Sequence, residues 1–432
     1  MRLNSVGLLP VLLRIENSCV SFFKRYFNTN SLIVATLISL PVYLNFFMLK
    51  FGINDNFFTK FIFTFILLLA FISFFYIKHS FFQTGFFIGI FWFYWISLSF
   101  RYYNLSFLIP LVIFAIGVFY GVVFWIIKKT ENFIKNSYMK KIYYILVFTF
   151  AFDYLAPFTF DWLKPEILFV NSFFGIDKIT LLIFFGAILF YEIDKKFLLL
   201  LIIPLFFINY DVPKMPKIKI YLASTYVPQN LKWKKFYIPV EIKNNFNLIN
   251  KAITNNYEAV VLPESAFPLF LNLHQDLMQK LKNLSQKIVI ITGALHYENR
   301  KFFNSTYIFE NGKVTILDKH LLVPFGEYIP LPFFQKEINH LFFADSSDFS
   351  VSKKFGEFKI KKFKFINAIC YELTSENLYK LKPNYVIGMS NLAWFNPSIM
   401  PSIQEMLIKI YAKKYKKVVF HSINGFRSQI IQ

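Results

Sequence analysis

The 432-residue sequence has few cysteines, few glycines and few acidic residues. It contains two cysteines and 14 glycines, and its 25 aspartates and glutamates are outnumbered by 47 lysines and arginines. The two cysteines, Cys19 and Cys370, lie in very different settings, so a disulfide framework is not expected. The histidines of the C-terminal half show no metal-ligand spacing, and we expect neither a metal nor a cofactor.

The excess of basic residues, a formal net charge of +22, raises the question of a nucleic-acid partner. The basic residues are scattered as pairs such as Lys413-Lys414 and Lys416-Lys417, and no recognisable nucleic-acid-binding module surrounds them. Basic loops also orient membrane helices. We therefore expect no nucleic-acid partner.

Apolar residues are abundant: they make up 56% of the chain, and aromatic residues alone make up 21%. In an ordinary soluble protein about half of the residues are apolar. The apolar residues dominate residues 31–210, whereas lysine, asparagine and acidic residues return in force after Asp211. This distribution predicts a multi-span transmembrane domain over residues 1–210 and an extramembrane domain over residues 211–432.

Seven apolar runs are long enough, or nearly long enough, to cross ~30 Å of hydrocarbon. They are Ser31–Leu49, Phe57–Ile77, Phe81–Phe100, Leu105–Ile127, Ile142–Phe158, Ile179–Ile193 and Phe197–Asn209. The last two runs are short, and a further apolar patch lies at Ile167–Phe174. The sequence therefore predicts about seven spans.

The loops between these runs differ in their basic residues. If the spans alternate, the loops on one side hold only Lys50, Arg101, Lys164 and Lys178. The N-terminal segment and the other loops hold Arg14, Lys24, Arg25, Lys78, Lys128, Lys129, Lys135, Lys140, Lys141, Lys195 and Lys196. Because Lys and Arg accumulate on the cytoplasmic side, we expect a cytoplasmic N-terminus. In a bacterium, this predicts a multi-pass inner-membrane protein, without a cleavable signal peptide, whose residues 211–432 face the periplasm.

The polar half has an alternating pattern that is typical of an α/β architecture. Strands are expected at Ile218–Ala223, Ala259–Leu262, Ile288–Thr292, Ser305–Phe309, Val314–Leu317, Phe365–Ile369, Tyr385–Met389 and Val418–His421. Apolar residues recur at helical spacing from Leu273 to Leu284 and from Ile403 to Ile410. Asn311-Gly312, between two strand runs, predicts a two-residue hairpin turn.

Three reactive side chains fall just past the ends of predicted strands. They are Glu264, Lys319 and Cys370. Open α/β sheets collect their active sites at such strand ends. The coincidence of three reactive residue types at three strand ends predicts that they form one active site.

Cys370 is a candidate nucleophile because it ends an apolar strand and precedes a plausible helix. A thiol at a helix N-terminus has a lowered pKa, and the backbone N–H of Tyr371 could bind an oxyanion. Glu264, in an apolar setting, could have a raised pKa and act as the base, while Lys319 would supply fixed positive charge. The alternative from local chemistry alone is a buried structural cysteine.

Five segments of the sequence carry a family resemblance. They read Val-Pro-Gln-Asn-Leu-Lys-Trp at 227–233, Leu-Pro-Glu-Ser at 262–265, Asp-Lys-His-Leu-Leu-Val-Pro-Phe-Gly-Glu-Tyr-Ile-Pro at 318–330, Ile-Cys-Tyr-Glu at 369–372 and Asn-Leu-Ala-Trp-Phe at 391–395. The sequence resembles the nitrilase superfamily, whose Glu-Lys-Cys triad has this chain order, and more closely the apolipoprotein N-acyltransferase family of bacterial membranes. The resemblance implies an α-helical transmembrane bundle joined to an α/β nitrilase-like domain, which is an αββα sandwich.

The resemblance also implies a reaction. Glu264 would be the general base, Lys319 the oxyanion stabiliser and Cys370 the nucleophile, which takes an acyl chain from a phospholipid as a thioester. The acceptor would be the N-terminal cysteine amine of a diacylglyceryl apolipoprotein, in the last step of bacterial lipoprotein maturation. The family further implicates four substrate-binding or supporting residues, which are Trp233, Glu327, Tyr371 and Glu372.

The chain departs from the family pattern after the segment that ends at Phe426, where the family continues with further strands and a last membrane span. We therefore expect the sheet of this chain to lack those strands. Two alternative functions follow from the same residues. One is a membrane-anchored amidase of the nitrilase type that uses water as its second substrate, and the other is an inactive member that binds lipid or lipoprotein.

Overall fold

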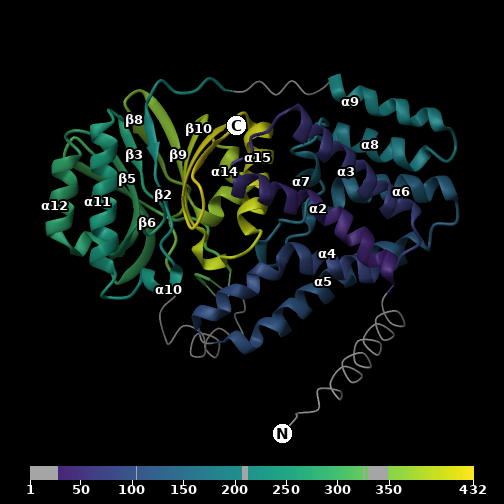
Figure 1. Ribbon diagram of the computed structural model, residues 1–432, viewed down its shortest axis with the longest axis horizontal. Coiled ribbons are helices and arrows are strands. Elements are labelled where there is room, and N and C mark those ends of the chain that lie inside the picture. The colour runs from purple at the N-terminus through teal and green to yellow at the C-terminus, as the bar shows by residue number, and fades with distance from the viewer. Residues whose placement is uncertain (1–27, 104, 207–212, 325, 329–348) are drawn as a thin grey trace, which may run out of the picture.

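The computed structural model describes residues 28–103, 105–206, 213–324, 326–328 and 349–432. Helices fill the N-terminal half, and two sheets with their covering helices fill the C-terminal half (Figure 1). The domain boundary predicted between residues 210 and 211, and the N-terminal segment predicted to be cytoplasmic, lie outside the described residues.

Among the described residues, four helices are long and apolar enough to cross a membrane. Three of them begin at a residue whose side chain accepts a hydrogen bond from a backbone N–H of the first turn. These residues are Asn28, Asn56 and Ser80. The helices are α2 (Thr29–Phe51), α3 (Phe57–Tyr76), α4 (Phe81–Phe93) with its 3-10 continuation η1 (Tyr94–Tyr103), and α5 (Ile109–Glu131) preceded by η2 (Ser106–Leu108). They occupy the first four predicted spans.

The other three predicted spans fall on shorter helices. These are α6 (Ser137–Phe150), α8 (Lys178–Phe190), and η5 (Lys195–Ile202) followed by α9 (Ile203–Phe206). A helix that crosses the hydrocarbon core needs about 20 residues, and α6 and α8 have 14 and 13. The further apolar patch contributes one buried turn, α7 (Glu166–Phe169). The count of seven spans stays a prediction.

The two ends of the helical bundle have different neighbours (Figure 1). At one end, Glu131 forms ion pairs with Lys128 and Lys140, and Lys141 pairs with Glu192. The other end contacts the C-terminal half through hydrogen bonds from Asn45 to Glu405, from Arg101 to Asn396 and from Trp162 to Thr374. The lysine-rich loops around residues 131–141 and 192 therefore lie at the end away from the C-terminal half.

Two six-stranded sheets form the C-terminal half in the described residues. The first has the order β1-β3-β5-β6-β7, with β4 beside β5, and the second has the order β12-β11-β10-β9-β8, with β2 beside β11. The first sheet contains β1 (Ile220–Leu222), β3 (Ala259–Val261), β4 (Phe267–Phe270), β5 (Val289–Glu298), β6 (Lys301–Glu310) and β7 (Lys313–Asp318). The second contains β2 (Ser224–Thr225), β8 (Glu357–Ile360), β9 (Phe363–Ile369), β10 (Tyr385–Asn391), β11 (Val418–Asn424) and β12 (Gln429–Ile431).

The sheets pack face to face, and helices cover their outer faces. Side chains such as Val261 of β3 and Ile387 of β10 meet between the sheets. The helices α11 (Ile238–Thr254) and α12 (Gln275–Leu284) cover the first sheet, and α15 (Met400–Tyr415) with the short α14 (Glu376–Tyr379) covers the second. These four layers confirm the αββα sandwich expected from the sequence.

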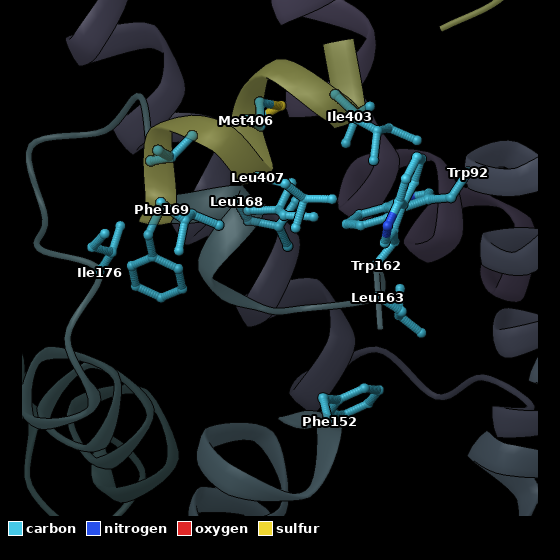
Figure 2. Close-up of a cluster of buried hydrophobic side chains, with 14 of the residues drawn as sticks. Trp92, Phe152, Trp162, Leu163, Leu168, Phe169, Ile176, Ile403, Met406 and Leu407 are labelled. Atoms are coloured by element: carbon cyan, nitrogen blue, oxygen red, sulfur yellow. The ribbon is translucent and has the colours of Figure 1, made fainter. Parts of the chain in front are cut away.

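One apolar core joins the two halves of the chain. Figure 2 shows Trp92, Trp162 and Leu168 of the N-terminal half packed beside Ile403 and Leu407 of α15. All five side chains are buried. The bundle and the sandwich therefore share a continuous core, to which α15 contributes from the side of the sandwich.

Candidate active site

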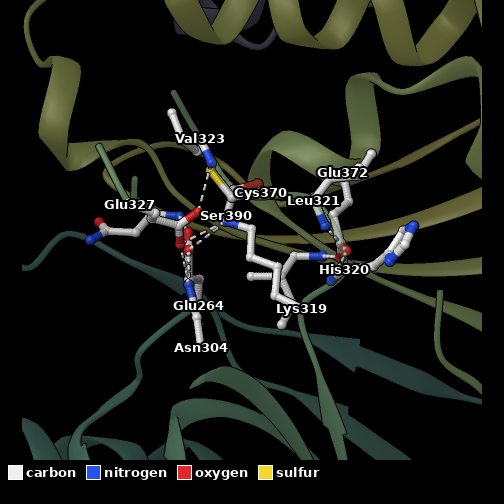
Figure 3. Close-up of polar contacts among 12 residues, drawn as sticks. Glu264, Asn304, Lys319, His320, Leu321, Val323, Glu327, Cys370, Glu372 and Ser390 are labelled. Atoms are coloured by element: carbon white, nitrogen blue, oxygen red, sulfur yellow. Dashed lines mark hydrogen bonds and ion pairs between the residues drawn. The ribbon is translucent and has the colours of Figure 1, made fainter. Parts of the chain in front are cut away.

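Three strand ends bring the predicted reactive residues together (Figure 3). Glu264 follows β3 of the first sheet, Lys319 follows β7 of the same sheet, and Cys370 follows β9 of the facing sheet. The Nζ of Lys319 lies 3.9 Å from Oε1 of Glu264, and the charges of both residues act on the thiol of Cys370. The three residues thus meet at the edge where the two sheets face each other.

Glu264 is a buried carboxylate, 7% exposed, whose two oxygens are both held. Its Oε1 accepts a hydrogen bond of 2.8 Å from Nδ2 of Asn304, and its Oε2 accepts one of 2.8 Å from the backbone N–H of Asn391. A Cβ at Gly293 would lie only 2.5 Å from the nitrogen of Ser265, so the Glu264 turn packs tightly on β5. Burial raises the pKa of Glu264 above its ordinary value, which suits a general base.

Lys319 is buried and held by a second carboxylate, that of Glu327. Its Nζ donates to Oε1 and Oε2 of Glu327 at 2.9 and 2.7 Å. Glu327 also accepts from the backbone N–H of Val323 at 2.9 Å and from Asn304 at 2.9 Å. Burial alone lowers the pKa of Lys319, but the charges of Glu327 and Glu264 outweigh it and raise the pKa. The lysine is therefore a fixed positive charge at the site.

Cys370 sits in a strained turn. Its φ is +52°, in the left-handed region that non-glycine residues seldom adopt. The expected helix after it is a five-residue 3-10 helix, η8 (Cys370–Thr374). Burial and the neighbouring charge of Glu264 raise the pKa of the thiol well above its ordinary value, against the opposing effect of Lys319.

The expectation of a lowered thiol pKa is therefore wrong. The expected stabilisation required a regular helix with its N-terminus at the sulfur, whereas the structure provides a short turn in a desolvated pocket. The resting thiol of Cys370 keeps its proton, and a base must remove it. The carboxylate of Glu264, whose charge acts on the thiol, is the candidate base.

Glu372 connects the Cys370 turn to the Lys319 loop. Its Oε2 accepts from the backbone N–H of Ile369 at 2.7 Å, and its Oε1 accepts from those of His320 and Leu321 at 2.7 and 3.2 Å. Burial raises the pKa of Glu372 to about 7, although the three hydrogen bonds oppose the shift. Glu372 thus holds the backbone on which two of the reactive groups stand.

The side chains of Tyr371 and Trp233 lie away from those of Glu264, Lys319 and Cys370. The hydroxyl of Tyr371 donates to the carbonyl of Thr159 at 2.6 Å, and its ring lies against Phe160 and Trp162 of the N-terminal half. Trp233 follows the short α10 (Gln229–Lys232) and is 41% exposed. Within the described residues, no hydrogen bond or ring contact joins Trp233 to the triad.

The sequence did not identify two asparagines that donate hydrogen bonds to Glu264. Asn304 of β6 donates to both Glu264 and Glu327, and Asn391 at the end of β10 donates to Glu264 through its backbone. Asn391 is the first residue of the Asn-Leu-Ala-Trp-Phe segment, and this motif could have indicated it. Asn304 lies in a strand, and no local sequence feature indicates it. Among the described residues, no three His, Cys, Asp or Glu side chains group as a metal site.

Comparison with known proteins gives the following likenesses. Residues 25–210 match the family model described as the apolipoprotein N-acyltransferase integral membrane domain. The apolipoprotein N-acyltransferase of Wolinella succinogenes is 37% identical over 406 residues, which cover 92% of this chain and 94% of that protein. That of Helicobacter hepaticus is 40% identical over 363 residues, 81% of this chain and 88% of that protein.

Among solved structures, a CN-hydrolase superfamily protein from Xanthomonas campestris matches with a TM-score of 0.39 and 14% identity. The match covers 50% of this chain and 83% of that chain.

Proposed function

The chain belongs to the apolipoprotein N-acyltransferase family of bacterial integral membrane enzymes, and from this premise we propose that it transfers acyl chains through Glu264, Lys319 and Cys370. The observation that carries the proposal is the convergence of the three side chains on one buried point, where the charges of Glu264 and Lys319 both act on the thiol of Cys370. A base beside a nucleophile and a fixed cation beside both is the arrangement that acyl transfer through a covalent intermediate requires.

In the first half-reaction, Glu264 takes the thiol proton and the sulfur of Cys370 attacks the ester carbonyl carbon of a phospholipid. The carbonyl oxygen becomes an oxyanion, which Lys319 and the backbone N–H of Tyr371 stabilise. Collapse of this intermediate breaks the ester bond. The departing lysophospholipid oxygen takes the proton from Glu264, and the acyl chain remains on Cys370 as a thioester.

In the second half-reaction, the N-terminal cysteine amine of a diacylglyceryl apolipoprotein attacks the thioester carbon. Glu264 takes a proton from the attacking amine. Collapse of the second oxyanion breaks the carbon–sulfur bond, and the sulfur of Cys370 regains a proton from Glu264. The products are the N-acylated lipoprotein and the free enzyme, so Glu264 and Cys370 return to their starting protonation states.

Glu327 and Glu372 are positioning residues in this scheme. Glu327 holds the Nζ of Lys319 with both oxygens, which fixes the cation while leaving Glu264 free to exchange a proton. Glu372 holds the backbone of the Cys370 turn against that of the Lys319 loop. For Trp233 and Tyr371 we propose supporting roles at the substrate side, which rest on the family resemblance.

We further propose a multi-pass inner-membrane protein with about seven spans in residues 1–210 and a periplasmic catalytic domain in residues 211–432. The bundle end that contacts the catalytic half carries few basic residues, and the opposite end carries the lysine-rich loops. The positive-inside rule then favours the cytoplasm for the lysine-rich end. This orientation would place the catalytic half beside outer-leaflet phospholipids and membrane-held lipoproteins.

The experiment that tests the proposal is thioester trapping. The full chain in detergent is incubated with dipalmitoyl phosphatidylethanolamine and no acceptor, and the peptides are analysed by mass spectrometry. We expect one palmitoyl group on Cys370. The matched control is Cys19→Ala, which should acylate normally, whereas Cys370→Ala should not. A wild-type chain without any acyl adduct would contradict the proposal.

Adding an acceptor separates the alternatives. With a diacylglyceryl lipopeptide, we expect the thioester to disappear as N-acylated peptide forms. Release of free fatty acid in place of acylated peptide would favour the amidase-type alternative, in which water is the second substrate. N-acylated lipoprotein in a Cys370→Ala strain with no other copy would favour the member that binds lipid without turnover.

A further inference from the structure

Gln404, in the second turn of α15, contacts the nucleophile from the side opposite to the base. The side chain is 1% exposed, and its Nε2 donates to the carbonyl oxygen of Cys370 at 3.3 Å. Within the described residues, the other amide atom, Oε1, has no hydrogen-bond partner. The hydrogen bond to Cys370 is therefore the polar interaction that explains a buried amide at position 404.

The carbonyl that Gln404 holds belongs to the peptide unit between Cys370 and Tyr371. A peptide unit is planar and trans, so its C=O and N–H groups point in opposite directions. A hydrogen bond that draws the carbonyl of Cys370 toward α15 consequently turns the N–H of Tyr371 away from α15. α15 covers the outer face of the second sheet, and Glu264 and Lys319 come from the first sheet, on the inner side.

We infer that Gln404 is a positioning residue for the oxyanion site: it fixes the Cys370–Tyr371 peptide so that the N–H of Tyr371 faces the reacting carbonyl. This inference rests on the proposed role of Cys370. The peptide needs such a restraint because the left-handed φ of Cys370 crowds its Cβ against the following carbonyl oxygen. A strained turn persists only where its surroundings hold it.

α15 can hold the Cys370–Tyr371 peptide in place because the N-terminal half fixes α15 next to Gln404. The Nδ2 of Asn45, a buried residue of α2, donates to Oγ of Ser402 at 3.0 Å and to Oε2 of Glu405 at 2.9 Å. Lys409, one turn further, forms an ion pair of 2.8 Å with Glu405. The Cys370–Tyr371 peptide is thus positioned against the bundle and not against the sheets alone.

The test compares acylation with alkylation of the same sulfur. Gln404→Met removes the donor and keeps the approximate volume, and Gln279→Met, on the exposed face of α12, is the matched control. Acylation of Cys370 by dipalmitoyl phosphatidylethanolamine forms an oxyanion, whereas alkylation by iodoacetamide does not. In Gln404→Met we expect acylation to slow on the order of 100-fold, while the alkylation rate and its pH profile stay as in wild type.

A second variant keeps the inference testable if Gln404→Met does not fold. Gln404→Leu also removes the donor and introduces no ionisable group into the buried site, so acylation should again slow with alkylation unchanged. Wild-type acylation in either variant would overturn the inference. Equal losses of acylation and alkylation would also overturn it, because they would indicate a general packing role. Absence of a thioester in wild type would instead contradict the proposed function itself.

Discussion

The two halves of the chain bury different kinds of side chain. In the helical half, Phe71 lies within 6.2 Å, centroid to centroid, of the rings of Phe148, Phe184 and Phe185. At the strand ends of the catalytic half, the charged side chains of Glu264 and Lys319 are buried, and each has a hydrogen-bond partner. Apolar packing tolerates changes of shape, whereas a buried charge that loses its partner is strongly destabilising. Substitutions should therefore have larger effects at the strand ends.

The largest effect should follow the loss of the buried cation. Lys319→Met leaves Glu264 and Glu327 as buried carboxylates without their cation. We expect acylation of Cys370 to become undetectable and the free energy of unfolding to fall by about 3–5 kcal/mol. Acylation by the phospholipid and thermal unfolding in detergent measure the two effects. A variant as stable as wild type would show that the charges of the site do not depend on one another.

Replacing Glu264, the proposed base, should separate activity from stability. Gln at position 264 can still accept from Asn304 or Asn391 but cannot take the thiol proton of Cys370. In Glu264→Gln we expect acylation to slow by about 10²- to 10⁴-fold, with a much smaller loss of stability than in Lys319→Met. The acylation rate as a function of pH is the readout. A variant that retained the wild-type rate would assign the base elsewhere.

Glu372 allows the stability of the catalytic half to be tested through pH. The pKa of this buried carboxyl is raised to about 7 from the ordinary 4.5, so its protonated form favours the folded state. That contribution is fully present below the unfolded pKa and is lost as the pH rises through about 7. By linkage, the loss is on the order of 3 kcal/mol between pH 4.5 and 7.

Glu372→Gln should lack this pH dependence. The free energy of unfolding of wild type and variant is measured with denaturant between pH 5 and 8. As the pH rises, the value for the variant should rise relative to that for wild type. The variant also loses one acceptor to the backbone N–H groups, so it can start from lower stability. Parallel curves at all pH values would show that Glu372 is not titrating in this range.

The sequence predicted the sheets better than the bundle. All eight expected strands occur, because they are short runs of apolar or β-branched residues with clear ends. The strands that it did not predict are β2, β4, β8 and β12, which have two to four residues. In the helical half, apolar residues continue through helices and turns alike, so hydropathy gave the first four spans and could not fix the lengths of α6 and α8.

At the proposed site, the sequence predicted the candidate residues but not their environment. Glu264, Lys319 and Cys370 were visible as strand-end residues and through the family motifs. The direction of the Cys370 pKa shift was not visible in the sequence, because it depends on burial between two sheets and on a carboxylate 106 positions earlier in the chain. Asn304 and Gln404 were missed for the same reason, since their contacts join elements far apart in sequence.

An aromatic substitution in the bundle should have a smaller effect than those at the strand ends. Phe71→Leu keeps an apolar side chain among the surrounding rings and loses their edge-to-face contacts. Aromatic pairs contribute about 0.5–1.5 kcal/mol each beyond area burial, and we expect a total loss of about 1–2 kcal/mol because neighbouring rings can shift. Thermal unfolding in detergent measures it, and acylation should stay near wild type. A loss as large as that of Lys319→Met would overturn the comparison.

The smallest effect should come from a charge pair that is not buried. Lys361, in the turn before β9, pairs with Glu258 beside β3, and the lysine side chain is 57% exposed. An exposed pair contributes about 0–1 kcal/mol, because water solvates both charges when they separate. Lys361→Met should therefore change the free energy of unfolding by less than about 1 kcal/mol and leave acylation unchanged. Because Lys319 and Lys361 both pair with glutamates of the same sandwich, the contrast between their variants isolates burial as the cause.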